Sequence, residues 1–232
     1  MHDLTRPMTH QTLIDLAGKL VADGSPVADI DFKWLRSWQA GDNGSQCQWT
    51  LNDHFGTHLD APIHVVPNTP GVDRVDIRRL FGEAVVLDCS DATGRGLTAA
   101  DFERAQPPIH EGDIVLIYSA ERPGTLEEFI KDQTYVTPEG AEWLVKHNVK
   151  SVGVEAFGFE NVYDGLFVRH CYRPEVKDPW PAHRICLSAN VYILEGLTNL
   201  GPIAGKRVRF SALPIPVPGS SGSPVRAVAW ED

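Results

Sequence analysis

Short runs of apolar residues in the middle of the chain predict buried strands. Segments 84–88, 114–118 and 151–154 are rich in valine and isoleucine, and turn-forming residues border them. Continuous apolar runs of this length are typical of strands that are covered on both faces of a sheet.

Helices are predicted between these strands. Residues 99–103 follow a threonine and carry acid in the first turn, and residues 137–145 open with Thr-Pro-Glu, a cap followed by proline. Apolar positions at helical spacing predict another helix over 9–22, and 126–130 is suited to a short one. Strands that alternate with helices and are followed by β-rich segments predict a mixed α/β or α+β fold. With no internal repeat or linker, we expect one domain over residues 1–232.

Residues 54–64, His-Phe-Gly-Thr-His-Leu-Asp-Ala-Pro-Ile-His, hold the clearest chemical signal. Three histidines and an aspartate occupy even positions: His54, His58, Asp60 and His64. An extended chain would place all four on one side. A helix would also bring His54 near His58, but the glycine and proline of this segment disfavour one. We therefore expect a strand end or extended loop that offers ligands to a divalent metal.

A second candidate site consists of His183 and Glu195, which border the apolar segment 185–194. Burying an unpaired charge is unfavourable, and a metal ion would compensate for it. Alternatively, His183 lies on the surface and Glu195 forms a salt bridge. The residues alone leave both interpretations open.

Composition narrows the classes of function. The formal net charge of −10 argues against a nucleic-acid-binding surface. No apolar run approaches the roughly 20 residues that span a membrane, and the N-terminus has no signal-peptide core. The cysteines are widely spaced and are interpreted as free thiols, which together with these features predicts a cytoplasmic protein: Cys47, Cys89, Cys171 and Cys186.

The pattern His-x-Gly-Thr-His-x-Asp-x-Pro-x-His over 54–64 resembles the signature of the cyclase-like metal-dependent hydrolases, which include bacterial kynurenine formamidase and isatin hydrolase. His183 and Glu195 resemble that family's second pair of metal ligands, and residues 222–227 resemble its usual C-terminus. The resemblance implies a swivelling β/β/α architecture, one or two Zn²⁺ or Mn²⁺ ions, and a homodimer or larger assembly.

The resemblance also implies a mechanism, in which metal-activated water cleaves an amide-type C–N bond. The first ion would have three ligands: His54, His58 and Asp60. Asp60 would bridge to a second ion held by His183 and Glu195. His64 would be the general acid/base that protonates the leaving nitrogen. In the competing interpretation, His64 is a third histidine ligand of the first ion.

Aromatic residues suggest a small, flat substrate. Tryptophans concentrate in residues 25–50 and further aromatic residues in 161–180, although tryptophans also commonly fill cores. We expect Trp38 and Phe55 to contact the substrate, which the resemblance implies is an aryl formamide or an isatin-like cyclic amide. Residues 153–160 depart from the formamidase pattern, because both acids there are glutamates, which leaves the exact substrate open.

Two other classes of function remain. A metal-dependent lyase or cyclase would use the same site without adding water to its substrate. A non-catalytic metal-binding protein would leave His64 without a role.

Overall fold

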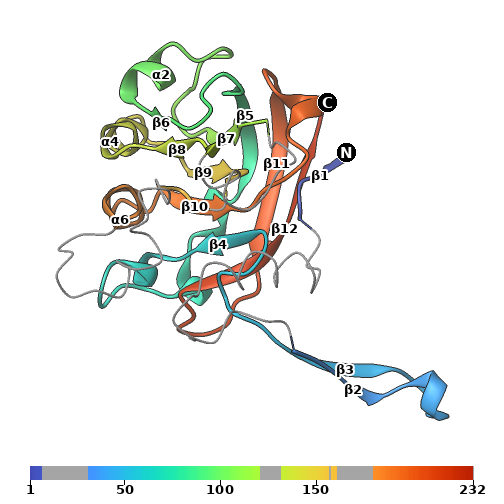
Figure 1. Cartoon of the computed structure of the whole chain (residues 1–232). Helices are drawn as coiled ribbons and strands as arrows, with labels where there is room; N and C mark the ends of the chain where they lie inside the picture. Colours follow the sequence, from blue (N-terminus) through green and yellow to red (C-terminus); the bar gives the residue numbers. More distant parts are fainter. Residues whose placement is uncertain (7–30, 121–131, 157, 161–179, 232) are drawn as a thin grey trace.

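The computed structural model describes residues 1–6, 31–120, 132–156, 158–160 and 180–231. Its centre is an eight-stranded sheet whose strands follow one another in the order β1 (His2–Asp3), β12 (Gly222–Trp230), β11 (Arg207–Pro214), β5 (Phe81–Asp88), β7 (Ile114–Tyr118), β9 (Ser151–Val154), β10 (Tyr192–Glu195) and β4 (His58–Asp60). β4 also pairs with β12. The sheet therefore curves round and closes on itself like a barrel (Figure 1).

Four neighbouring strands, β5, β7, β9 and β10, run parallel. Their central apolar residues are buried in the hydrophobic core, as expected for a parallel sheet covered on both faces. The three strands predicted at 84–88, 114–118 and 151–154 are confirmed as parts of β5, β7 and β9. The remaining strands pair antiparallel with their neighbours: β11, β12 and β4 close the ring, and β1 lies along the outer edge of β12.

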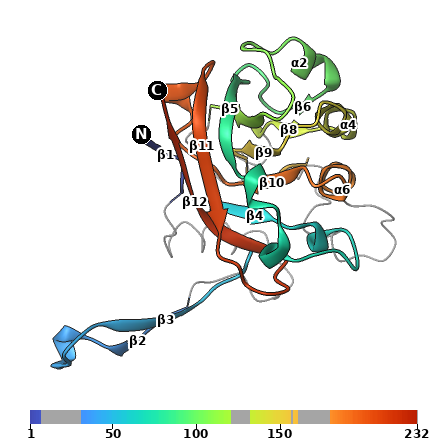
Figure 2. The same ribbon diagram turned by 180° about the vertical axis from the view of Figure 1, so that it is seen from behind.

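Within the described residues, three α-helices lie on one side of the sheet: α2 (Ala99–Glu103), α4 (Pro138–Lys146) and α6 (Pro181–Ser188) (Figures 1 and 2). The first two confirm the sequence prediction, caps included. The Thr98 backbone N–H donates to Asp101 across 2.8 Å, and the Thr137 hydroxyl accepts from the Gly140 N–H at 3.1 Å. The helices predicted at 9–22 and 126–130 lie outside the described residues.

Shorter elements complete the described part of the chain. A small parallel pair is formed by β6 (Gly96–Leu97) and β8 (Tyr135–Val136). The 3₁₀ helices are η1 (Trp38–Ala40), η2 (Pro62–His64), η3 (Val72–Arg74), η4 (Ile77–Arg79) and η5 (Gly201–Ile203).

A β-hairpin of β2 (Asp31–Arg36) and β3 (Gln46–Thr50) projects away from the rest of the molecule (Figures 1 and 2). Its aromatic residues are exposed: Trp34 by 54%, Trp38 by 65% and Trp49 by 45%. These tryptophans therefore do not fill the core of their own chain.

The predicted mixed α+β class is confirmed, with one strand-rich, barrel-like sheet and few helices. Within the described residues, no helix has both the length and the apolar character that crossing a membrane requires.

Candidate metal centre

The centre of the site is β4, which presents His58 and Asp60 on the same face of the sheet because they are two residues apart. Both side chains are buried, and Asp60 is only 1% exposed. Nε2 of His58 lies 3.4 Å from Oδ1 of Asp60. Two potential metal ligands are therefore adjacent and shielded from water.

Strand pairing brings Glu195 to this face. In the antiparallel register of β10 and β4, Glu195 stands opposite His58, and directly opposed residues share one side of a sheet. Oε2 of Glu195 lies 3.5 Å from Nε2 of His58. The long-range pairing thus joins residues that are far apart in the sequence.

His183 enters from α6 and faces the same point. Its Nε2 lies 3.3 Å from Oδ2 of Asp60 and 3.3 Å from Oε1 of Glu195. His183 is 1% exposed, so the surface interpretation of this residue is wrong. The segment between His183 and Glu195 is buried except for half-buried Arg184 and Ile185 and an exposed turn at 188–190, where α6 ends and the chain turns back into β10.

The donor set fits a divalent metal. Each of the imidazoles of His58 and His183 lies 3.3 to 3.5 Å from both carboxylates, those of Asp60 and Glu195. Ligands of a four-coordinate ion with bonds of about 2.1 Å stand about 3.4 Å apart. Furthermore, Oδ2 of Asp60 is buried without a hydrogen-bond partner in the described structure, and a cation would satisfy it.

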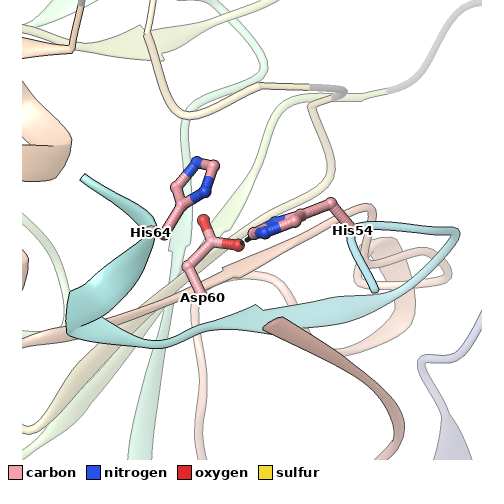
Figure 3. A group of neighbouring side chains, drawn as sticks. All are labelled: His54, Asp60 and His64. Atoms are coloured by element: carbon pink, nitrogen blue, oxygen red, sulfur yellow. Dashed lines mark hydrogen bonds and ion pairs between the residues drawn. The ribbon is translucent and has the colours of Figure 1, made fainter. Parts of the chain in front are cut away.

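His54 and His64 approach Asp60 as a second group (Figure 3). Nδ1 of His54 lies 2.7 Å from Oδ1 of Asp60, and the rings of His54 and His64 are 4.1 Å apart between centroids. The other five residues predicted as ligands or catalyst therefore converge on Asp60. Two candidate ligand groups share Asp60: His58 and Glu195 form one group with it, whereas His54 and His64 form the other.

The predicted extended row of ligands is only partly correct. His58 and Asp60 lie on a strand, but His54 precedes it in a turn and His64 ends the 3₁₀ helix η2. Gly56 has a φ of +65°, which turns the chain ahead of β4, and Pro62 starts η2 with its fixed φ. Side chains converge because the chain bends at both ends of the strand.

A hydrogen-bonded support behind His54 was not predicted. Nε2 of His54 lies 3.0 Å from the Ser221 hydroxyl, and that hydroxyl donates to Oδ2 of Asp53 across 2.8 Å. Gly222 leaves the necessary space, because a Cβ there would lie 2.9 Å from the ring of His54. No sequence spacing relates residue 53 to residue 221, so only the closed sheet reveals this contact.

The charges of the cluster oppose the effect of burial. Burial acts to raise the pKa of Asp60, but the surrounding imidazoles of His54, His183 and His58 outweigh it and hold that pKa well below its usual range. Burial acts to lower the pKa of His58, but the hydrogen bond and charge of Asp60, together with Glu195, raise it to about 9. Asp60, Glu195 and Glu160 likewise raise the pKa of His183 well above its usual value. The carboxylates therefore form a strong site for positive charge.

His64 behaves differently. Burial lowers the pKa of His64 to about 4, and the neighbouring imidazoles of His54 and His183 act in the same direction. At neutral pH its ring is uncharged and can accept a proton.

The structure places the two predicted substrate-contact residues in different surroundings. Phe55 is buried next to His54, whereas Trp38 lies in η1, at the end of the projecting hairpin and apart from the cluster (Figure 1). Trp180 is an aromatic residue beside the site, with its ring 5.9 Å from His64 and 5.1 Å from His183. It belongs to the aromatic segment 161–180, whose other residues lie outside those described.

Comparisons with known proteins show which family the chain resembles in sequence and fold. A sequence model of the cyclase family, described as "Putative cyclase", matches residues 2–161. The chain is 27% identical to kynurenine formamidase of Geobacillus thermodenitrificans over 86% of its length and 87% of the relative's. It is 28% identical to isatin hydrolase of Roseibium aggregatum, covering 77% of this chain and 72% of that one. The solved structure of isatin hydrolase A from Ralstonia solanacearum superposes with a TM-score of 0.78, at 24% identity, over 98% of this chain and 90% of the other.

Fold and site together define an enzyme of the hydrolase class with a centre suited to a divalent metal. The chain belongs to the cyclase family.

Proposed function

We propose that this enzyme hydrolyses a C–N amide-type bond in a small molecule with the help of a divalent metal, Zn²⁺ or Mn²⁺. The observation that carries the proposal is the convergence of four buried candidate ligands, His58, Asp60, His183 and Glu195, with an uncharged histidine, His64, beside them. Ligands without thiolate suit both metals. The names of the relatives, kynurenine formamidase and isatin hydrolase, support the amide bond.

The residues have distinct roles in this proposal. One or two ions are held by His54, His58, Asp60, His183 and Glu195. A bound ion would supply the Lewis acidity that polarises the amide carbonyl and makes hydroxide available at neutral pH. The uncharged ring of His64 takes the proton released when water attacks and returns it to the leaving nitrogen. Oδ1 of Asp60 holds the ring of His54, and Ser221 supports that ring from the other side.

The proposed substrate is an aryl formamide or an isatin-like cyclic amide. The indole of Trp180 beside His64 and His183 supports a flat aromatic group, because such rings stack on aromatic side chains. Phe55 and Trp38 are the further proposed contacts. Trp38 would reach a substrate only in an assembly, since it stands clear of its own chain's site.

The direct test is hydrolysis of a substrate panel by protein loaded with Zn²⁺ or Mn²⁺. Proton release and product mass would be measured with N-formylkynurenine, simpler aryl formamides, isatin and related cyclic amides. We expect one class to gain one water per molecule and the activity to disappear with a chelator. Turnover without added water would instead indicate the lyase alternative, and inactivity across the panel with metal bound would contradict the amide assignment.

We propose further that residues 1–232 act as one catalytic domain in a cytoplasmic homo-oligomer, a dimer or larger. Unpaired thiols at Cys47, Cys89 and Cys186 suit a reducing compartment. The β2–β3 hairpin supports self-association, because an isolated two-stranded hairpin with exposed aromatic residues is marginally stable in water. A second copy presents the same surface, so that two hairpins can cover each other in a two-fold contact.

Replacing Trp34 with serine is expected to shift the protein from dimer, or a larger assembly, toward monomer, because it removes apolar area from the proposed contact. Light scattering coupled to size-exclusion chromatography measures this. The matched control is Ile77→Ser, at a similarly exposed apolar residue in η4 on the body of the molecule, which should leave the mass unchanged. A wild-type protein that is monomeric at micromolar concentration would contradict the proposal.

A further inference from the structure

Glu160 is one of two buried glutamates in residues 155–160, just after β9, and its carboxylate faces α6. It is only 7% exposed. Its Oε2 lies 2.7 Å from Nδ1 of His183, while Oε1 accepts hydrogen bonds from the backbone N–H groups of Ala182 and His183. One carboxylate therefore contacts both the ring of a candidate metal ligand and the helix that carries it.

The contact at Nδ1 determines which nitrogen of His183 is available to a metal. An ionised carboxylate only accepts hydrogen bonds, so Nδ1 carries a proton and donates it to Glu160. The lone pair of the uncharged ring is then on Nε2, the atom that faces Asp60 and Glu195. Metal-binding histidines commonly donate their other N–H to a carboxylate in this way, which orients the ring and fixes the tautomer.

Glu160 also anchors the start of α6. Trp180, the residue at the N-cap position, makes no side-chain capping bond. The first-turn N–H groups of Ala182 and His183 point instead to Glu160, which supplies the acceptor that a capping side chain would provide. The position of α6, and with it the position of His183, thus depends on the same carboxylate.

We propose that Glu160 is a positioning residue of the metal centre, holding His183 in the Nδ1–H tautomer with Nε2 directed at the ion. This inference rests on the metal centre proposed above. In the sequence, Glu160 is an acid without an assigned role that follows a predicted buried strand. Its partner, His183, becomes apparent only in the fold.

The variant Glu160→Gln separates the two contacts. Glutamine keeps an oxygen that can accept from the first turn of α6, but it places an NH₂ donor against Nδ1 of His183. The Nδ1–H tautomer then loses its acceptor. We expect Zn²⁺ affinity, measured by competition with a chromogenic chelator, to fall about 10- to 100-fold. In NMR spectra of the Zn²⁺-loaded protein, the hydrogen-bonded Nδ1–H proton of His183, present in the wild type, should be lost.

Glu155→Gln is the matched control. Glu155 is buried in the same segment, but its carboxylate accepts from the backbone N–H groups of Ser119 and Leu200. This variant should lower the melting temperature while keeping Zn²⁺ affinity within about twofold of the wild type, since a positioning effect needs contact with a ligand.

Three outcomes would overturn the inference. Wild-type Zn²⁺ affinity in Glu160→Gln would show that the contact is not needed. An equal loss in both glutamine variants would indicate a general structural effect. A wild-type protein that binds no Zn²⁺ would remove the metal centre itself, and that result is distinguished from the first two by the wild-type titration alone.

Discussion

Replacing His64 with alanine is expected to lower kcat/KM by about 10²- to 10⁴-fold, the usual contribution of a general acid/base. The metal content should stay at the wild-type level, because the buried set around Asp60 remains complete without this ring. Steady-state kinetics on the best substrate of the panel and elemental analysis of the same preparation provide the two measurements.

The protonation state of His64 sets the pH range in which the ring can act as a base. Because burial lowers its pKa to about 4, the ring is half protonated near pH 4 and uncharged throughout the neutral range, where it can accept a proton. A bound cation would favour the uncharged ring further. Activity lost on acidification near pH 6 would therefore reflect protonation of other groups.

An exposed histidine provides the control for this variant. His110→Ala, on a surface loop, should leave both kinetics and metal content unchanged. If His64→Ala instead lost its metal, His64 would be a ligand, as in the competing interpretation. If it kept both its metal and full activity, the general acid/base role would be wrong.

Replacing Asp60 with asparagine is expected to abolish metal binding and to lower kcat/KM by about 10³-fold or more. Asp60 is the residue shared by both groups of candidate ligands, and its Oδ2 has no hydrogen-bond partner within the described structure. A bound metal contributes several kcal/mol of transition-state stabilisation, and each 1.36 kcal/mol corresponds to a factor of ten. Elemental analysis and the shift in melting temperature on adding Zn²⁺ measure the loss of binding.

Asp113→Asn is a suitable control, because Asp113 is also a buried aspartate but pairs with Arg207 away from the cluster. It should lower the melting temperature and retain the metal. Full metal occupancy in Asp60→Asn, with the control behaving as expected, would contradict the assignment of Asp60 as the central ligand.

Local patterns predicted much of the fold. The strands β5, β7 and β9 and the helices α2 and α4 follow from apolar runs and caps that involve near neighbours in the sequence. The hairpin was not predicted, because its exposed tryptophans resemble core residues in composition. The hairpin projects because the rest of the chain folds without covering it, and a local sequence pattern holds no information about that.

The candidate site was likewise predicted in part, from local sequence patterns but not from contacts across the fold. The even spacing of residues 54–64 predicted four side chains that the fold brings together around Asp60, and the resemblance added His183 and Glu195, which lie beside them. The supports of Asp53, Ser221 and Glu160 were missed, because each acts through a hydrogen bond across the tertiary structure. Polar residues of this kind are common on surfaces, and only their hydrogen-bond partners in the fold distinguish them.

The pairing of β4 with β12 also has a consequence for biosynthesis. His54 rests against Ser221, which is 167 positions further along the chain, and β4 needs β12 on one edge. A ribosome therefore releases the histidine-rich segment long before its neighbour strand has been made. Until then the candidate ligands of the nascent chain are exposed to solvent. Contacts between residues so far apart in the sequence also form slowly. Binding of a metal to the completed site would therefore follow the synthesis and pairing of β12.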